Sequence, residues 1–288
     1  MANLLSLCMI VKNEEARLTA CLASVQGVAD EIVVVDTGST DATPLIAACH
    51  GARVVPFDFS RTDFAAARNA GLAMARGEWI LVLDADEMLL PASAPRIHEL
   101  VTGNENAGYY FARHNSLASG EAITDYAVRL FPHRPDYRFR GRVHETVDDS
   151  ILAGGGRLKT TDIRIDHNFS PDPAARALKN RRYIRILEEE LADDPSDISR
   201  LGFLAAEYHQ LGLLAEASAI TEKIVEAAPH DPQAHLNAGI YRLIHHANPA
   251  RARIAFLRAL ELKPGYPAAA SFLQTLDGVR PDEGLMRV

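Results

Sequence analysis

Two acidic clusters are the residues whose types and spacing can do chemistry. Asp84 and Asp86 stand two positions apart directly after the apolar run WILVL, and Glu87 adds a third carboxylate. Carboxylates at positions i and i+2 can reach a shared Mg²⁺ or Mn²⁺ ion. Such an ion would neutralise a diphosphate and help it leave, acting as a Lewis acid. Acidic triplets of this kind are more often a solvated surface, but the preceding strand favours a metal site.

A second acidic residue, Asp36, follows the apolar run EIVVV. A carboxylate at this place can accept hydrogen bonds from a nucleotide base or a ribose hydroxyl. The following residues, Ser39 to Asp41, are typical of a tight turn that caps a helix. Capping explains those residues and leaves Asp36 as the candidate for ligand binding.

Both acidic clusters require a sheet that brings them together. Apolar runs predict buried parallel strands at 4–11, 31–35, 53–56 and 79–83, and the segments between them predict helices at 13–25, 41–50 and 64–76. This alternation is typical of an α/β fold with right-handed crossovers. In such sheets ligands bind beyond the carboxyl ends of the strands, where both clusters fall.

The rest of the chain changes character twice. Shorter strands are expected at 109–113, 126–131 and 161–165, in a mixed, loop-rich region suited to an acceptor substrate. Beyond Ser170 there are no strand signals, and Pro173 to Ala192 reads as a long amphipathic helix. We therefore expect two domains, 1–170 and 171–288.

An internal repeat follows that long helix. Residues stand where a tetratricopeptide consensus places them in two successive units: Leu204, Tyr208, Ala217 and Pro229, then Ala252, Phe256, Ala259 and Pro264. Ala217 and Ala252 are thirty-five residues apart, as are Pro229 and Pro264. Fewer than three repeats are marginal alone, so we expect the array to dock on the catalytic domain or on a second subunit.

Bulk composition sets outer limits on function. The 288 residues carry a formal net charge of -8, which makes nucleic acid an unexpected partner. Three cysteines without a CxxC pair do not support a zinc ribbon or a disulfide scaffold. The sequence predicts neither a signal peptide nor a membrane span. We expect a cytoplasmic protein and leave open a peripheral contact with the inner face of the membrane.

At this point the chain resembles a known family. The segments LSLCMIVKNEEARL, EIVVVDTGSTDAT and ARNAGLAMARGEWILVLDADE resemble successive nucleotide-binding segments of family 2 glycosyltransferases, which have the GT-A (Rossmann-like) fold. RLFPHRPDYRFRGRVHE resembles a later segment of one subgroup. That subgroup is similar to bacterial enzymes of lipopolysaccharide-core assembly, and other members carry tetratricopeptide tails. The resemblance covers roughly the first 170 residues and the type of the tail.

The resemblance implies roles for individual residues. Val11, Asn13 and Glu14 would line the nucleotide pocket, and Asp36 would bind uracil or ribose. Arg68 and Asn69 would approach the diphosphate or help to order the pocket. Asp84 would contact ribose or metal, and Asp86 would ligate the metal. These expectations require a divalent cation, Mn²⁺ or Mg²⁺, as cofactor.

The resemblance also implies a catalytic base and a third metal ligand. GT-A enzymes have a carboxylate base after the DxD motif, in a segment often ending Glu-Asp; here Glu145 is the candidate, with Asp125 and Asp148 as alternatives. A carboxylate can take the proton from an acceptor hydroxyl as its oxygen attacks the anomeric carbon. Many family members also use a downstream histidine as a metal ligand, which indicates His167 first and His144 second.

Two groups of basic residues stand out in this acidic chain. Arg138, Arg140 and Arg142, with Arg129 and Arg134 upstream, can hold a diphosphate or an anionic acceptor, or can be paired strand residues. Arg142 is the member we assign to the donor site. In the long helix, Arg181, Arg182 and Arg185 form either a lipid-facing patch or an ordinary helix surface.

The combined interpretation is an inverting glycosyltransferase. It would transfer a sugar from a nucleotide-diphosphate sugar, with UDP favoured, to a glycan, a lipid-linked or a peptide acceptor. A nucleotidyltransferase is disfavoured because the stretch VKNEEARL lacks the glycine-rich loop of that class. A non-catalytic adaptor that senses nucleotide sugar and binds a protein through its repeats is the third hypothesis. The repeats would recruit a partner protein or form a homodimer.

Overall fold

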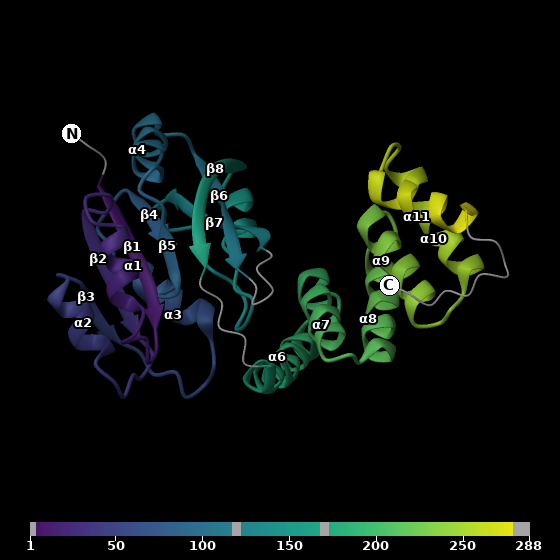
Figure 1. Cartoon of the computed structure of the whole chain (residues 1–288), viewed down its shortest axis with the longest axis horizontal. Coiled ribbons are helices and arrows are strands. Elements are labelled where there is room, and N and C mark those ends of the chain that lie inside the picture. Colours follow the sequence, from purple (N-terminus) through teal and green to yellow (C-terminus); the bar gives the residue numbers. More distant parts are fainter. Residues whose placement is uncertain (1–3, 117–121, 168–172, 279–288) are drawn as a thin grey trace. The chain divides into compact units, whose positions relative to one another are not determined.

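The chain folds into two compact units. The computed structural model describes residues 4–116, 122–167 and 173–278. The units are Met1–Pro171 and Asp172–Val288. The first is an eight-stranded sheet covered by helices, and the described part of the second contains helices α6 to α11 (Figure 1).

The sheet of the first unit is mixed. Its spatial order is β3-β2-β1-β4-β7-β6-β8-β5. The strands span β1 Leu5–Val11, β2 Glu31–Asp36, β3 Arg53–Pro56, β4 Trp79–Val82, β5 Glu87–Leu89, β6 Ala107–Ser116, β7 Ala122–Pro132 and β8 Arg157–His167. The first four strands pair in parallel, whereas β7 is antiparallel to both β4 and β6. The predicted α/β fold is therefore confirmed.

Helices cover both faces of this sheet. They span α1 Leu18–Ser24, α2 Thr43–Cys49, α3 Phe64–Met74, α4 Ser93–Gly103 and α5 Asp148–Ala153. One buried cluster joins β1 residues such as Leu7 and Met9 to α1, α2 and α4. A second cluster joins Cys8 of the same strand to α3 and α5. This alternation follows from the period of two along a strand, and it buries the parallel strands on both faces.

The helix predicted for 13–25 is wrong in its first half. Helix α1 begins only at Leu18, because Asn13 adopts a left-handed φ of 56°. The backbone N–H groups of Asn13, Glu14 and Glu15 donate to side-chain oxygens of the next loop, at distances of 2.9, 2.7 and 3.2 Å. The segment is thus a turn fastened to the residues that follow β2.

The second unit repeats one helical pair. Its helices span α6 Pro173–Asp193, α7 Ile198–Gln210, α8 Leu214–Ala227, α9 Pro232–Ile244, α10 Pro249–Leu262 and α11 Pro267–Gly278. Helices α7 and α9 each have 13 residues, and α8 and α10 each have 14. The small consensus residues Ala217, Ala252 and Ala259 are fully buried. The predicted tetratricopeptide-like character of the tail is confirmed. None of the described helices has the length and apolar character that a membrane span requires.

Gly239 is expected to be essential for packing within the second repeat. A Cβ atom at this position would overlap the ring of Phe256, which is fully buried between α9 and α11. Gly239→Ala should therefore lower the free energy of unfolding by about 1–3 kcal/mol, as overpacking does. Gly202→Ala is the matched control, because Gly202 also lies within a helix but has open space around it. Chemical denaturation monitored by circular dichroism compares them; equal stability of the two variants would contradict the prediction.

Candidate functional site

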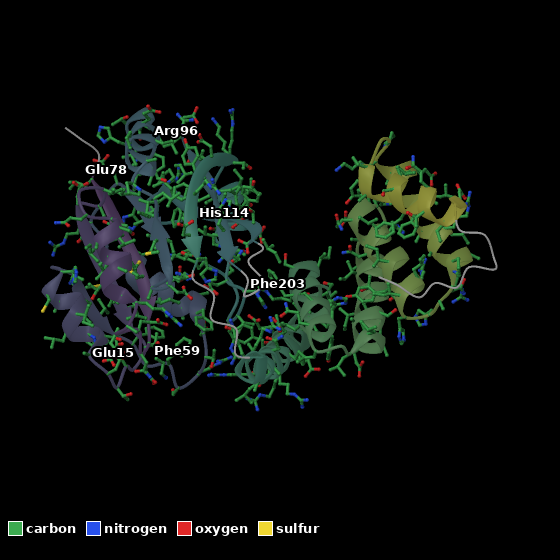
Figure 2. The ribbon with its side chains drawn as sticks, viewed as in Figure 1. Glu15, Phe59, Glu78, Arg96, His114 and Phe203 are labelled. Atoms are coloured by element: carbon green, nitrogen blue, oxygen red, sulfur yellow. The ribbon has the colours of Figure 1, made fainter. Side chains whose placement is uncertain are left out.

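The site lies where the parallel strands of the first unit end. Glu15 follows β1 and Phe59 follows β3, and both lie at one end of the sheet, whereas Glu78, just before β4, lies at the other (Figure 2). The carboxyl end of β2 carries Asp36, whose register partner on β1 is Val11. The predicted ligand-binding residues are thus placed at the carboxyl edge of the sheet.

The turn after β1 and the turn after β2 hold each other. The carbonyl of Val11 accepts hydrogen bonds from the backbone N–H and the hydroxyl of Thr37, each at 3.0 Å. Asn13 accepts from the N–H of Thr40 at 2.8 Å and donates its own N–H to Ser39 at 2.9 Å. Val11 and Asn13 therefore fix the shape of this edge through their backbone and amide groups.

The carboxylates of Asp36 and Glu14 border this double turn. Asp36 accepts from the hydroxyl of Ser39 at 2.5 Å and from its N–H at 3.2 Å. Glu14 lies 3.4 Å from Arg17. Burial raises the pKa of Glu14, and Arg17 partly offsets this effect. The orientation of Asp36 is therefore set before any ligand binds.

Arg68 joins two of the predicted site carboxylates. It lies on α3, a helix whose N-cap, Asp63, accepts from the N–H of Ala66 at 2.8 Å. Its Nε donates to Glu145 at 2.7 Å and its Nη2 donates to Asp84 at 2.8 Å. Its Nη1 is buried and has no hydrogen-bond partner among the described residues. Arg68 itself is only 8% exposed.

A chain of alternating charges continues from Asp84 across the sheet. Arg129 of β7 donates to Asp84 at 3.1 Å and also pairs with Glu87, which is fully buried. Glu87 in turn lies 3.5 Å from Arg113 of β6. Arg113 holds both oxygens of Asp125, its cross-strand neighbour, at 2.6 and 2.9 Å. The two candidate bases, Glu145 and Asp125, thus stand at opposite ends of one charge network.

The network makes the stability of the fold sensitive to acid. Burial raises the pKa of Asp84, but Arg68 and Arg129 outweigh it and hold that pKa well below its usual value. Asp84 therefore contributes stability above about pH 4, the range of its unfolded pKa, and that stability is lost as the pH falls further. We expect the free energy of unfolding to fall between about pH 5 and pH 2, and Asp84→Asn to reduce this slope. Urea denaturation at a series of pH values measures how the free energy of unfolding changes with pH. The same slope in Asp84→Asn and in the wild type would refute this role of Asp84.

Asp86 and His167 form the pair best suited to a metal. His167 ends β8 opposite Glu87, and its Nε2 lies 3.3 Å from a carboxylate oxygen of Asp86. Its Nδ1 contacts the amide oxygen of Asn115 at 2.5 Å, an outer partner that fixes the ring. The hydrogen bond with Asp86 raises the pKa of His167.

Asp84 fits a metal less well than this pair does. Its two carboxylate oxygens accept from Arg68 and Arg129. Among the described residues there is no group of three or more metal-ligating side chains. A site with one protein carboxylate suits an ion such as Mn²⁺ or Mg²⁺, which completes its shell with phosphates and water.

Three other predicted residues lie around the network. Both ends of the Asn69 amide bond the backbone of Phe139, each at 2.9 Å, so Asn69 orders the pocket wall. Arg142 donates its Nε to the carbonyl of Thr62 at 3.0 Å, at the start of α3. His144 has a left-handed φ of 50° beside Glu145. The contacts of Asn69 and Arg142 attach the segment carrying Glu145 to α3.

The basic cluster expected from the sequence is dispersed. Arg129 is buried in the charge network, whereas Arg134 pairs with Asp136 at the surface. Arg138 donates to the backbone carbonyls of Arg134 and Tyr137. Arg129 and Arg134 thus follow the alternative of paired residues, and the assignment of Arg142 to the donor site stays a prediction.

Comparison with known proteins identifies the family. The family model described as "Glycosyl transferase family 2" matches residues 6–157, which include Asp36, the DxD motif and Glu145. The chain belongs to glycosyl transferase family 2. The sequence-based expectation of membership in this family is confirmed. The match covers both turns, strands β2 to β7, nearly all of β1 and the whole charge network, whereas His167 on β8 lies beyond it.

Named relatives agree with both parts of the chain. A TPR repeat-containing protein of Synechococcus elongatus is 39% identical over 209 residues, covering 69% of this chain and 51% of the relative. The SPbeta prophage-derived glycosyltransferase SunS of Bacillus subtilis is 29% identical over 213 residues, covering 73% and 50%. The chain thus spans about half the length of these relatives.

One solved structure shares the fold. The crystal structure of S. aureus TarS 1–349 aligns with a TM-score of 0.51 and 13% identity, covering 94% of this chain and 92% of that one. At this level of identity the likeness shows the fold alone, and it agrees with the GT-A architecture expected from the sequence.

Proposed function

We propose that this chain transfers a sugar from a nucleotide-diphosphate sugar, with UDP as the favoured nucleotide, to an acceptor hydroxyl. The observation that carries the proposal is the bridge from Glu145 through Arg68 to Asp84, two residues before Asp86. This bridge would put the carboxylate of Glu145, which is suited to act as a general base, next to the expected donor site. The acceptor class, a glycan, a lipid-linked sugar or a peptide, belongs to the same proposal. Residues 1–170 would be the catalytic domain and 171–288 a repeat domain for a partner protein or a homodimer.

The donor would bind across the carboxyl edge of the parallel strands. The preformed turns that contain Asn13 and Asp36 would take the nucleoside, with the Asp36 carboxylate facing the base or ribose. The free Nη1 donor of Arg68 suits a diphosphate oxygen, because a buried guanidinium without a partner gains most from an anionic ligand. Glu14 would border the same pocket.

Glu145 would act as the general base. Only its Oε1 takes part in the bond with Arg68, which leaves Oε2 for the acceptor. Oε2 would remove the hydroxyl proton as the acceptor oxygen attacks the anomeric carbon and the bond to the diphosphate breaks. Displacement from the opposite side inverts that carbon. Asp86 and His167 would hold a divalent cation, which when bound would neutralise the leaving diphosphate.

Ligand-induced stabilisation tests the donor site and the metal together. UDP with Mn²⁺ at about 100 times its Kd should add about 2.7 kcal/mol to the free energy of unfolding. The corresponding rise in Tm should need the metal and should be absent in Asp86→Ala. Other nucleoside diphosphates are the comparison that identifies the donor class. Absence of any shift with every nucleotide would reject the proposal and favour the non-catalytic adaptor.

A further inference from the structure

Helix α6 carries an unusual separation of charge. The fifteen residues Pro173–Leu187 contain five bases and no acid, and the next seven, Glu188–Asp194, contain five acids and no base. This order does not follow the helix macrodipole, which favours anions near the N-terminus and cations near the C-terminus. The helix macrodipole therefore does not account for the separation.

The bases lie on the exposed side of α6. The opposite side is buried through Asn180, Ile184 and Leu187, and the amide of Asn180 donates to Gln210 of α7 at 3.0 Å. Spacings of three, four and seven residues from Leu178 place Arg181, Arg182 and Arg185 on the other side. We call Leu178, Arg181, Arg182 and Arg185 the basic face; Arg176 and Lys179 are exposed beside it.

An apolar residue stands within this charged surface. The side chain of Leu178 is 72% exposed, the most exposed of the large hydrophobic residues of the chain's described part. A basic helical surface with a solvent-facing leucine is the composition that binds the headgroup layer of an anionic membrane. We propose that the basic face of α6 docks this protein on a membrane that contains anionic lipids.

Electrostatics favours a membrane over a second copy of the chain. An antiparallel α6 pair would match Arg181 with Glu189 and Arg182 with Glu188, but exposed ion pairs contribute little to association. Each base near an anionic bilayer instead strengthens binding about fivefold.

Vesicle cosedimentation of the full chain tests this proposal without reference to sugar transfer. The vesicles are phosphatidylcholine alone or equal parts phosphatidylcholine and phosphatidylglycerol. We expect binding to the second kind only, with release as NaCl rises from about 0.1 to about 0.5 M. The triple variant Arg181→Gln/Arg182→Gln/Arg185→Gln should bind on the order of a hundredfold more weakly.

A matched variant separates the basic face from net charge. Arg251→Gln/Arg253→Gln/Arg258→Gln removes three bases from α10 and should bind vesicles like the wild type. Circular dichroism checks that both variants keep their helices, since Gln and Arg have similar helix propensity. Equal loss in both variants, or no binding by the wild type, would overturn the proposal. Sedimentation velocity that shows a dimer lost only in the α6 variant, without vesicle binding, would assign the face to a second copy instead.

Discussion

Replacement of Glu145 by Gln should slow sugar transfer by about two to four orders of magnitude. General-base catalysis contributes an acceleration of this size, and an amide cannot take the acceptor proton. The substitution preserves shape, and the amide oxygen can still accept the Nε–H of Arg68, which now lies 2.7 Å from Oε1. Stabilisation by UDP and Mn²⁺ should therefore remain. Transfer rates with saturating donor, measured beside the thermal shift, give both quantities.

Asp125→Asn is the matched control at the other end of the network. Asp125 is more exposed than Glu145, with 45% of its side chain accessible against 14%, and both its oxygens hold Arg113. We expect its loss to affect the rate far less. A normal transfer rate in the Glu145 variant and a large loss of rate in the Asp125 variant would show that Asp125, and not Glu145, is the general base. The third candidate, Asp148, accepts a hydrogen bond from Tyr110, so it is engaged elsewhere.

The parallel half of the fold could be predicted because its signals are local. Strands such as β2 and β4 are continuous apolar runs that end at an acidic residue, and burial on both faces produces this pattern. The other half was only partly predicted. The short β5 is just three residues, and helices α4 and α5 were not identified. Their positions depend on pairing with β8 and packing on the sheet, which local periodicity does not encode.

The charge network is the part of the candidate site that could be predicted only in part from the sequence. Carboxylates after strands were visible as candidates, because position relative to a strand is readable from the sequence. Their pairing with Arg113 and Arg129 was not visible, since these arginines come from strands whose pairing is long-range; Arg129 was named only as part of the basic cluster. One signal was present: Arg129 stands alone among apolar residues in YAVRLF, and a buried base needs a carboxylate partner. Asn115, the partner of His167, had no comparable signal.

The same pairing explains why the turn after β1 was read as a helix. VKNEEARL has helical composition, but its N–H groups bond to Ser39, Asp41 and Thr43, which are about 26 to 29 residues away. Tertiary bonds thus outweighed local propensity. Helix α1 begins later, after Arg17 and without a side-chain cap, where the apolar residues Leu18 and Leu22 are buried.

Replacement of Arg68 by Met should have the largest effect on the stability of the first unit. Removing one partner from a buried ion pair costs about 3–5 kcal/mol, because the remaining charge is left uncompensated. Arg68 is only 8% exposed and holds both Asp84 and Glu145. Arg68→Lys should lie between the wild type and Arg68→Met. A lysine keeps the charge but cannot form the two-pronged contact that a guanidinium makes. Equilibrium unfolding in urea measures all three proteins.

Arg134→Met is the control for this experiment, because its pair with Asp136 is exposed on both sides, at 43% and 45%. An exposed pair contributes at most about 1 kcal/mol, so this variant should unfold close to the wild type. If Arg68→Met also destabilises by less than that, the network does not hold the site together. The double variant Arg68→Met/Glu145→Gln decides the cause. Partial recovery relative to Arg68→Met would show that the uncompensated Glu145 charge, rather than lost packing, accounts for the destabilisation.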